Sequence, residues 1–351
     1  MNKVLVIGAT GILGKLVCQE ILRQLDRSQL VVADYQIERG KQLAQSLSNQ
    51  TEFCYVDITK RDSIEAAICQ VNVVIVALKQ KEPAVQKLCI GRGVHCIDVT
   101  PFSSFTSQVE QLHNYALEKG VCSITMSGFF PGLSALMVKK AVKQFDEVSN
   151  VDVALLQHTN AKAGITGIMD MLQIISEPLT KENQLTYTGF TRRKKLPFGD
   201  CQTLRFVREI HHDEKEFVAE KLGLDSIHYW TAWNNDSFNH LLFILQKIGL
   251  LKRLVKMKNP RLLSHFVKHN QSKGEEAFLT VEVIGMISGT RKKKALTLST
   301  PSDYQVTAMA TAALVNVINN RHAGVVFPFE LTDVDTVLNI INSKSISLTE
   351  C

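Results

Sequence analysis

Short apolar runs alternate with longer helix-compatible stretches over the first 126 residues of the chain. The runs span residues 4–7, 30–33, 52–56, 73–77, 95–99 and 123–126, and most are rich in valine and isoleucine. Their apolarity is continuous rather than alternating, which is typical of strands that are buried on both faces. The pattern therefore predicts an α/β fold, with an N-terminal doubly wound parallel sheet of the Rossmann type.

After Pro131 the pattern changes to a mixture of strands and helices. A helix is expected at 132–145, and strands are expected near 151–156, 184–189, 202–208, 226–233, 277–287 and 294–298. Further helices are expected at 237–257, 260–269, 303–320 and 333–342. We expect a Rossmann domain at 1–127, a mixed α/β substrate-binding and dimerisation domain at 128–300, and C-terminal helices at 301–351 that pack back on the first domain.

Composition narrows the class of protein. The 351 residues carry 45% hydrophobic and 21% charged side chains, as globular enzymes do, and the net charge of +6 is too mild to indicate nucleic acid. None of the 8 cysteines forms a C-x-x-C pair, so we expect them to be reduced and buried in a cytoplasmic protein. No apolar run approaches the roughly 18 residues that span a bilayer, and no integral membrane segment is expected.

The first predicted strand leads into a helix through a glycine-rich loop, Gly8-Ala9-Thr10-Gly11-Ile12-Leu13-Gly14. In such loops the first glycine allows a tight turn, the second lets a diphosphate approach the backbone, and the third lets the helix pack closely on the sheet. The helix N-terminus then offers N–H groups to the anion. We expect Gly8, Thr10, Gly11, Ile12 and Gly14 to bind a dinucleotide; the alternative is tight packing alone.

Two carboxylates follow the next strands. Asp34 lies 20 residues after Gly14 and ends its strand, where it can accept hydrogen bonds from ribose hydroxyls, so NAD is favoured and NADP remains open because Arg39 is near. Asp57 and Ile58 follow the third strand and are expected to contact adenine. Capping of the next helix is an equally good role for Asp57.

The remaining strands also end on residues suited to a site. Ala77, Leu78 and Thr100 are expected to contact the cofactor. Asp98 and Lys79 are the candidates for the chemical step, with Asp98 as a positioning group more than a proton carrier. The alternative for Lys79, which is favoured, is a solvated lysine at the start of a helix beside Lys81. Two further features are candidates for binding a substrate. The turn at 128–134 could present backbone N–H groups to a carboxylate, or it could be only a hinge. Arg192 opens a basic run and could grip a carboxylate, or it could lie in a solvated turn.

The chain resembles the saccharopine dehydrogenase-like oxidoreductases over nearly its full length. The matching motifs are the Gly8–Gly14 loop, "DIT" at 57–59 with "VNVVI" at 71–75, "GVHCIDVT" at 93–100, "GFFPGLS" at 128–134, and later segments at 283–285, 303–308 and 324–328.

The resemblance implies a Rossmann domain joined to a mixed α/β domain, in a homodimer. It also implies an NAD(P)-linked oxidoreductase acting on a C–N bond, an imine or amine, of a small amino-acid-like substrate. Gly128, Phe130, Pro131, Gly132, Ser134 and Arg192 are then the expected substrate contacts.

Two other functions remain open. Tyr115 and Lys119 have the Y-x-x-x-K spacing of short-chain carbonyl or enoyl reductases, although a lysine in a last helical turn is ordinary. The amphipathic segment 238–257 would suit a dinucleotide-binding protein without enzyme activity, regulatory or at a membrane surface. No metal is expected, because the adjacent side chains of His211 and His212 would point apart on a strand.

Overall fold

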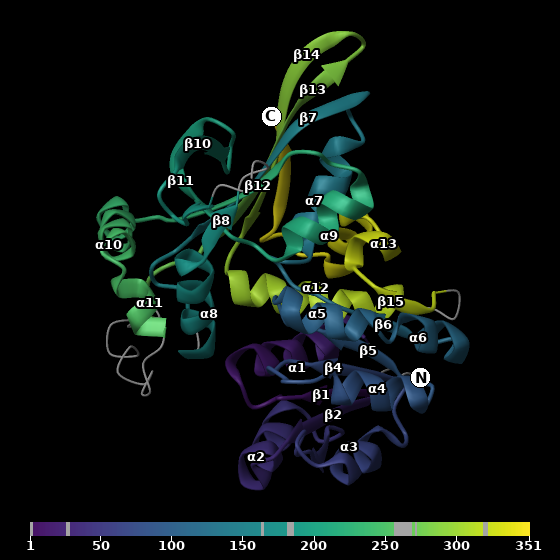
Figure 1. The fold of residues 1–351 in the computed structure, drawn as a ribbon. Helices are drawn as coiled ribbons and strands as arrows, with labels where there is room; N and C mark the ends of the chain where they lie inside the picture. The colour runs from purple at the N-terminus through teal and green to yellow at the C-terminus, as the bar shows by residue number, and fades with distance from the viewer. Residues whose placement is uncertain are drawn as a thin grey trace. The chain divides into compact units, whose positions relative to one another are not determined.

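The computed structural model describes residues 3–25, 29–162, 165–180, 186–255, 269–270, 272–318 and 322–351. The chain divides into two compact units. The first comprises Met1–Leu136 and Tyr304–Ser343, and the second comprises Met137–Asp303 and Lys344–Cys351. Each unit has its own seven-stranded sheet (Figure 1).

The sheet of the first unit is entirely parallel, with the strand order β15-β6-β5-β4-β1-β2-β3. Its strands are β1 (Lys3–Ile7), β2 (Gln29–Asp34), β3 (Glu52–Tyr55), β4 (Val73–Val76), β5 (His95–Asp98), β6 (Cys122–Ile124) and β15 (Gly324–Val326). Six of them coincide with the predicted apolar runs. The predicted Rossmann-type sheet is therefore confirmed.

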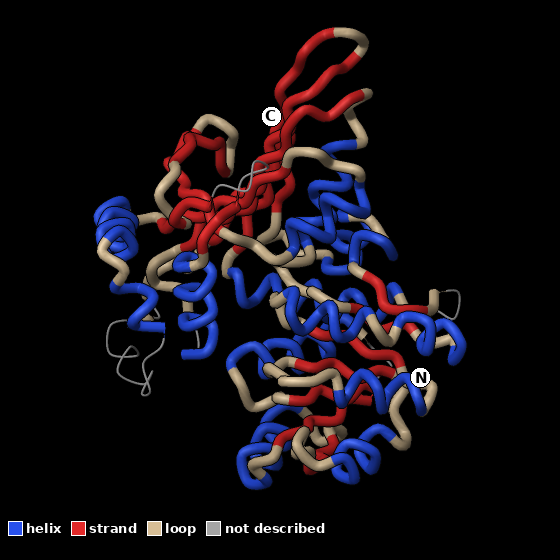
Figure 2. Tube along the Cα trace, in the orientation of Figure 1, coloured by secondary structure: helices blue, strands red, loops and turns tan. Residues whose placement is uncertain are grey.

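Helices cover both faces of this sheet. In β1, Val4 and Val6 belong to a core cluster shared with α1, α2 and α12, whereas Leu5 and Ile7 belong to a cluster shared with α3 and α4. Successive side chains of a strand point to opposite faces, so both faces need apolar residues, which explains the unbroken apolar runs. Figure 2 shows the strands between helices.

The helices of the first unit connect these strands or return to them from the C-terminal part of the chain. They are α1 (Ile12–Gln24), α2 (Ile37–Leu47), α3 (Arg61–Ile68), α4 (Ala84–Gly91), α5 (Ser103–Glu110), α6 (His113–Lys119), α12 (Asp303–Val317), α13 (Pro328–Leu331) and α14 (Val334–Ile341). Helix α7 (Leu133–Val142) leads into the second unit.

The sheet of the second unit is mixed, with the order β10-β11-β12-β7-β13-β14-β16. β12 pairs with β7 in parallel and all other neighbours are antiparallel. The strands are β7 (Glu147–Gln157), β10 (Arg193–Phe198), β11 (Thr203–Ile210), β12 (Ile227–Trp233), β13 (Ala277–Ile287), β14 (Thr290–Thr300) and β16 (Ser347–Glu350). A two-stranded sheet, β8 (Pro178–Thr180) and β9 (Thr186–Thr188), and helices α8 (Ile165–Ser176), α9 (Glu214–Leu222), α10 (Asp236–Lys247) and α11 (Leu250–Val255) complete the unit. The predicted second mixed α/β domain is confirmed.

The edge strand β10 folds over the middle of its own sheet. The Thr280 hydroxyl donates to the Pro197 carbonyl over 2.8 Å, and the Gly199 amide donates to the Thr297 hydroxyl over 3.1 Å. Leu196 and Phe198 of β10 consequently share a buried cluster with Trp230 of β12. The sheet is therefore strongly curled and encloses one of its own faces.

The expectation of uniformly reduced and buried cysteines is wrong. Cys201, in the β10–β11 turn, and Cys351, after β16, form a disulfide across a sequence separation of 150 residues. Of the free cysteines, Cys69 is exposed and Cys54 is half-buried, whereas Cys18, Cys89, Cys96 and Cys122 are buried. The pairing depends on curling of the sheet, which brings its two edges together and which spacing in sequence does not reveal.

Some predicted elements differ in detail. The basic run at 192–195 lies mostly on β10 rather than in a turn, and the predicted helix at 237–257 is divided into α10 and α11 at Gly249, whose φ is +72°. Most of the helix expected at 260–269 lies outside the described residues. Within the described residues, we find no helix with both the length and the apolarity needed to span a membrane.

Candidate cofactor and active site

The carboxyl ends of the strands place the predicted site residues along one edge of the first sheet. Gly8 follows β1, Asp34 ends β2, Leu78 lies just after β4, and Asp98 ends β5. Since β1 pairs with β2 on one side and with β4 on the other, the glycine-rich loop lies where the strand order reverses. Ligands of open α/β sheets bind at this switch point.

The loop makes a close turn from β1 into α1. Gly8 has a φ of +81°, and a Cβ at Gly14 would clash with the Gly8 carbonyl and lie 2.8 Å from the Ala9 Cα. Gly11 is the N-cap of α1 and provides no side chain to bond the first N–H groups of the helix. Bare backbone and a helix N-terminus therefore face the same space, which fits the diphosphate of a dinucleotide.

Asp34 is buried beside this loop. Its Oδ2 accepts a hydrogen bond from the Thr10 hydroxyl over 2.5 Å, and its Oδ1 accepts one from the Gln36 amide over 2.8 Å. Arg39 donates to the Thr10 carbonyl over 3.3 Å, so a guanidinium contacts the same loop. The position thus offers a hydrogen-bond acceptor suited to ribose hydroxyls and a cation suited to a 2′-phosphate.

We expect Asp34→Ala to weaken NADH binding about tenfold, or ~1.4 kcal/mol, and NADPH binding much less. The substitution removes the acceptor of the ribose hydroxyls and leaves Arg39 in place. Arg39→Ala is the matched control, with NADPH binding weakened more than NADH binding. Isothermal titration of both variants with both cofactors measures the effect, and a greater loss of NADPH binding in Asp34→Ala would contradict the NAD preference.

Asp57 caps the turn before α3. Its Oδ1 accepts hydrogen bonds from the Thr59 amide and hydroxyl over 3.0 and 2.7 Å. These bonds hold the pKa of the Asp57 carboxyl below its usual value. Ile58 packs against the core cluster of α3 and α4. The Asp57 side chain therefore stabilises the turn, whereas the N-cap of α3 is Lys60, so the expected capping of that helix by Asp57 is wrong. Its contact with adenine stays a prediction.

Asp98 is fully buried at the end of β5. Its Oδ1 accepts the Thr100 amide over 2.7 Å, and its Oδ2 accepts the side-chain amides of Gln86 and Gln80 over 2.8 and 3.2 Å. Burial raises the pKa of Asp98 to about 6, although these hydrogen bonds act in the opposite direction. Neither glutamine was predicted. In the sequence Gln86 is followed by Lys87, so its pattern does not mark it as a buried residue.

The end of β4 contacts the loop directly. The Ala77 amide donates to the Ile7 carbonyl over 2.9 Å, and a Cβ on Gly8 would lie 3.1 Å from the Leu78 side chain. The Lys79 ammonium lies 4.5 Å from the centroid of the Phe102 ring, in a cation–π contact. Ala77 and Leu78 are therefore placed beside the loop, as expected for cofactor contacts, and the role of Lys79 stays a prediction.

The turn at 128–134 closes on itself. The Leu133 amide donates to the Gly128 carbonyl over 2.9 Å, and the Ser134 amide donates to the Phe129 carbonyl over 3.1 Å. These two N–H groups, expected from the sequence to face a ligand, therefore have partners within the turn. The turn is joined to the end of β5, because the Ser127 amide and hydroxyl both donate to the Asp98 carbonyl.

Arg192 belongs to the second unit and is not a free guanidinium. Its Nη1 lies 2.9 Å from Glu209 Oε2 and 3.1 Å from the Tyr187 hydroxyl. Burial tends to raise the pKa of Glu209, but hydrogen bonds from His228 and Tyr187 and the charge of Arg192 bring it below its usual value. The predicted fork for a substrate carboxylate is therefore already bound to a protein carboxylate.

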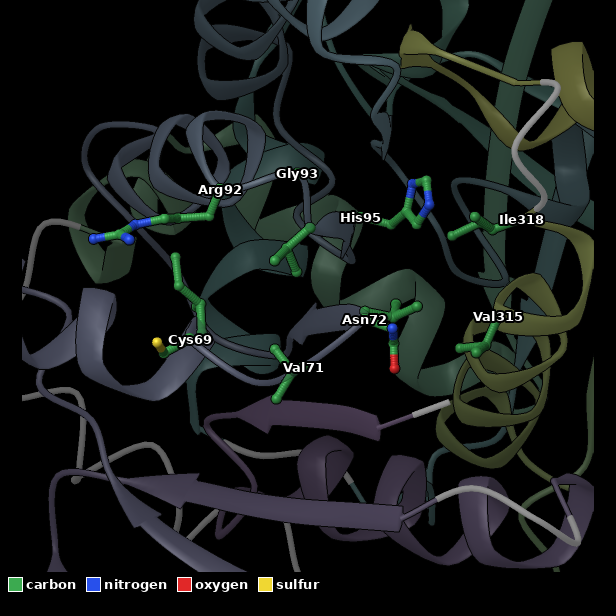
Figure 3. Close-up of a pocket in the computed structure, with 11 residues that line it drawn as sticks. Cys69, Val71, Asn72, Arg92, Gly93, His95, Val315 and Ile318 are labelled. Carbon is green, nitrogen blue, oxygen red and sulfur yellow. The ribbon is translucent and has the colours of Figure 1, made fainter. Parts of the chain in front are cut away.

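A cavity of about 430 Å³ lies at the opposite edge of the first sheet (Figure 3). Its lining includes Asn72 and His95, which lie at the amino ends of β4 and β5, and Arg92. Dinucleotides bind at carboxyl ends, so this cavity is separate from the loop.

The alternative pair Tyr115–Lys119 also lies away from the glycine-rich loop. Tyr115 packs with Ile90 of α4, and Lys119 ends α6 just before β6 begins, at the amino edge of the sheet. A short-chain reductase arrangement would need both groups beside the nicotinamide. Their positions in the structure suit packing and helix termination.

Helix α10 lies in the amphipathic segment on which the membrane-surface alternative depends. Three apolar side chains are exposed there: Leu241 and Ile244 on the helix, and Ile248 directly after it. On its other side Phe243 contacts the Arg208 guanidinium at 4.2 Å. The helix thus partly covers the outer side of β11, and the exposed side chains stay compatible with the membrane-surface alternative.

Comparison with known proteins agrees with this geometry. Residues 4–125 match the model of the saccharopine dehydrogenase NADP binding domain. The fold is similar to that of saccharopine dehydrogenase (L-Glu forming) from Saccharomyces cerevisiae, with a TM-score of 0.77, 13% identity, and coverage of 100% of this chain and 99% of that chain.

Two further dehydrogenases have lower TM-scores. The DAP dehydrogenase of C. glutamicum in complex with DAP has a TM-score of 0.51 and 10% identity, covering 98% of this chain and 96% of that one. An engineered D-amino acid dehydrogenase bound to NADP+ has a TM-score of 0.51 and 11% identity, with the same coverage.

The resemblance inferred from the sequence is therefore confirmed: residues 4–125 form a saccharopine dehydrogenase-type domain that binds a nicotinamide dinucleotide, as in an NAD(P)-dependent oxidoreductase.

Proposed function

We propose that the protein reversibly reduces an imine, or oxidises an amine, of an amino-acid-like substrate, with NAD as the preferred cofactor. The proposal rests on one observation. The chain that contains the cofactor loop shares its fold, over its full length, with the saccharopine dehydrogenase (L-Glu forming) of Saccharomyces cerevisiae. The engineered D-amino acid dehydrogenase, which has a similar fold, supports the same substrate class.

The proposed roles follow from the contacts of the first unit. The loop from Gly8 to Gly14 holds the diphosphate, and Asp34 selects the ribose. When bound, the nicotinamide dinucleotide supplies or accepts the hydride. The β5–α5 connection is held by Asp98, whose carboxylate fixes the Thr100 amide and the Gln80 side chain. Asp98 is therefore proposed as a positioning residue.

Turnover and binding test the proposal together. We expect micromolar binding of NADH by isothermal titration, and loss of NADH absorbance only when an amino acid and a 2-oxo acid are both supplied. We also expect oxidation of an amino acid or secondary amine in the presence of NAD+. If the protein bound neither NADH nor NADPH, the proposed enzyme function would be wrong.

Two controls separate the alternatives. Tyr115→Phe is expected to leave turnover intact; lost turnover with intact cofactor binding would instead favour the short-chain reductase. A panel of amines, imines and carbonyl compounds gives the other control. Cofactor binding without turnover of any of them, together with sedimentation on anionic vesicles that depends on α10, would favour a non-enzymatic protein.

A further inference from the structure

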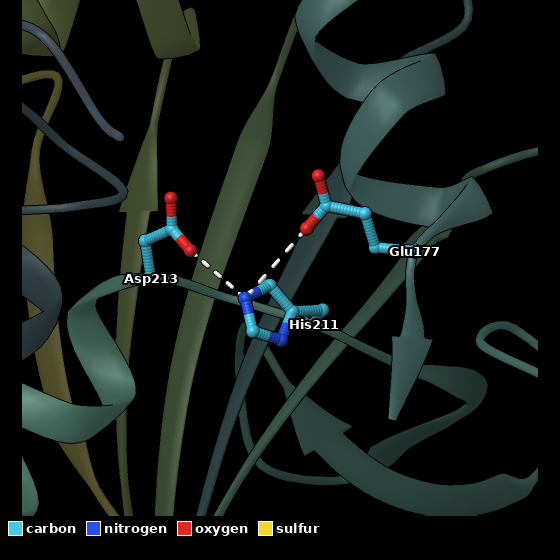
Figure 4. Close-up of side chains that lie close together, drawn as sticks. All are labelled: Glu177, His211 and Asp213. Carbon is cyan, nitrogen blue, oxygen red and sulfur yellow. Dashed lines mark hydrogen bonds and ion pairs between the residues drawn. The ribbon is translucent and has the colours of Figure 1, made fainter. Parts of the chain in front are cut away.

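Three ligand-bearing side chains from two separate connections of the second unit meet at one point. Glu177 lies between α8 and β8, His211 follows β11, and Asp213 precedes α9 (Figure 4). In the part of the chain that the structure describes, these three form the one group of histidine, cysteine and carboxylate side chains arranged to hold a metal ion. None of them takes part in the proposed redox chemistry.

The distances between their ligand atoms suit a single small cation. His211 Nε2 lies 2.8 Å from Asp213 Oδ1 and 3.6 Å from Glu177 Oε2, and all three atoms lie within 4.8 Å of one another. Ligand atoms about 2.0–2.1 Å from a tetrahedral Zn²⁺ are about 3.3 Å apart. The two His211 distances bracket that value and the remaining pair is at most 4.8 Å apart, so the three ligand atoms can surround one ion after side-chain adjustment.

The charges of the cluster also favour a cation. Two carboxylates converge on one imidazole nitrogen, which carries at most one proton and donates one hydrogen bond. The imidazole can therefore satisfy only one of the two carboxylates, and a cation at this point would be attracted by both.

Neighbouring contacts orient the ligands. The Gln173 side-chain amide donates to Glu177 Oε1 over 3.1 Å, which leaves Oε2 directed at His211. As the sequence predicts, His212 turns the other way: it stacks on Tyr229, with centroids 4.5 Å apart and an interplanar angle of 2°. This buried stack anchors the connection that carries His211 and Asp213.

We propose that Glu177, His211 and Asp213 form a binding site for a divalent transition-metal cation, with Zn²⁺ as the best match to one imidazole and two carboxylates. The side chains of Glu177 and His211 are each 34% exposed, and that of Asp213 is 15% exposed. A bound ion would therefore keep a position for water and exchange with solvent. It would join the α8–β8 connection to the β11–α9 connection.

The test uses untagged full-length protein stripped of metal with a chelator and titrated with zinc chloride by calorimetry. We expect one strong site with a micromolar Kd at neutral pH and a higher Tm in the presence of zinc. His211→Ala should weaken binding at least thirtyfold, and Glu177→Gln about tenfold. His240→Ala, which removes an exposed imidazole on α10, is the matched control and should bind as the wild type does.

Cobalt(II) provides a second measurement on the same proteins. The absorption spectrum of the bound cobalt should show nitrogen and oxygen ligands, without the thiolate band that binding at Cys69 or Cys54 would produce. The His211→Ala substitution should abolish this cobalt spectrum. Absence of strong zinc binding, or equal binding by wild type and a folded His211→Ala, would overturn the proposal. So would an unchanged Kd in both Glu177→Gln and Asp213→Asn.

Discussion

Replacing Gly11 with valine is expected to lower the affinity for NADH at least 100-fold, or ~2.7 kcal/mol, and to leave the fold intact. Gly11 has a φ of −67° and a ψ of 167°, which any residue adopts, and an added Cβ would meet only the Gly8 carbonyl at 3.3 Å. The new side chain would instead fill the space before the N-terminus of α1, where the diphosphate binds.

Gly14→Ala is the comparison that separates binding from folding. Its Cβ would clash with the Gly8 carbonyl and lie 2.8 Å from the Ala9 Cα, so β1 and α1 would have to move apart. Thermal unfolding should show a lowered Tm for Gly14→Ala and a nearly unchanged Tm for Gly11→Val. Retained NADH affinity in Gly11→Val would show that the diphosphate does not lie against this loop.

Asp98→Asn is expected to change how stability depends on pH. Burial raises the pKa of Asp98 from 3.8 to about 6, so the folded state binds this proton more tightly than the unfolded state does. The proton on Asp98 therefore contributes to stability fully below the unfolded pKa, and this contribution is lost as pH rises through about 6. When the pH is lowered from about 8 to about 4, the free energy of unfolding of the wild type should increase by roughly 2–3 kcal/mol relative to that of Asp98→Asn.

Urea unfolding of both proteins across this pH range measures the difference, because other titrating groups contribute equally to both. A positioning role also predicts an activity profile with an inflection near the same pH, which the variant should lack. A pH-independent difference in unfolding free energy would show that Asp98 does not titrate there. If the activity profile of Asp98→Asn kept the same inflection as that of the wild type, Asp98 would have no role in the site.

Local patterns were sufficient to predict the first sheet. The six predicted strands are short apolar runs, most of which contact helices on both sides, and the glycines that define the loop all lie between residues 8 and 14. The doubly wound order follows from general rules for strand–helix alternation. For these reasons Gly8, Asp34, Leu78 and Asp98 could be placed at one edge before the structure was available.

Features that depend on distant segments could not be predicted in the same way. Glu209 neutralises Arg192 because β11 returns beside β10, and Gln86 reaches Asp98, at the end of β5, from helix α4. The pattern predicts no strand at 193–198, since four consecutive basic residues hide the alternation of Lys194, Leu196 and Phe198 toward the enclosed face. Side-chain partners of this kind leave no signal in spacing or composition.

The Cys201–Cys351 bond has a practical consequence for mapping the molecule by proteolysis. A single cut anywhere between these residues opens the peptide backbone but leaves both pieces covalently attached, so the nicked protein keeps its mass apart from one added water. Fragments would separate on a gel only after treatment with a thiol. Digests of this protein should therefore be compared with and without reductant before any region is judged resistant to cleavage.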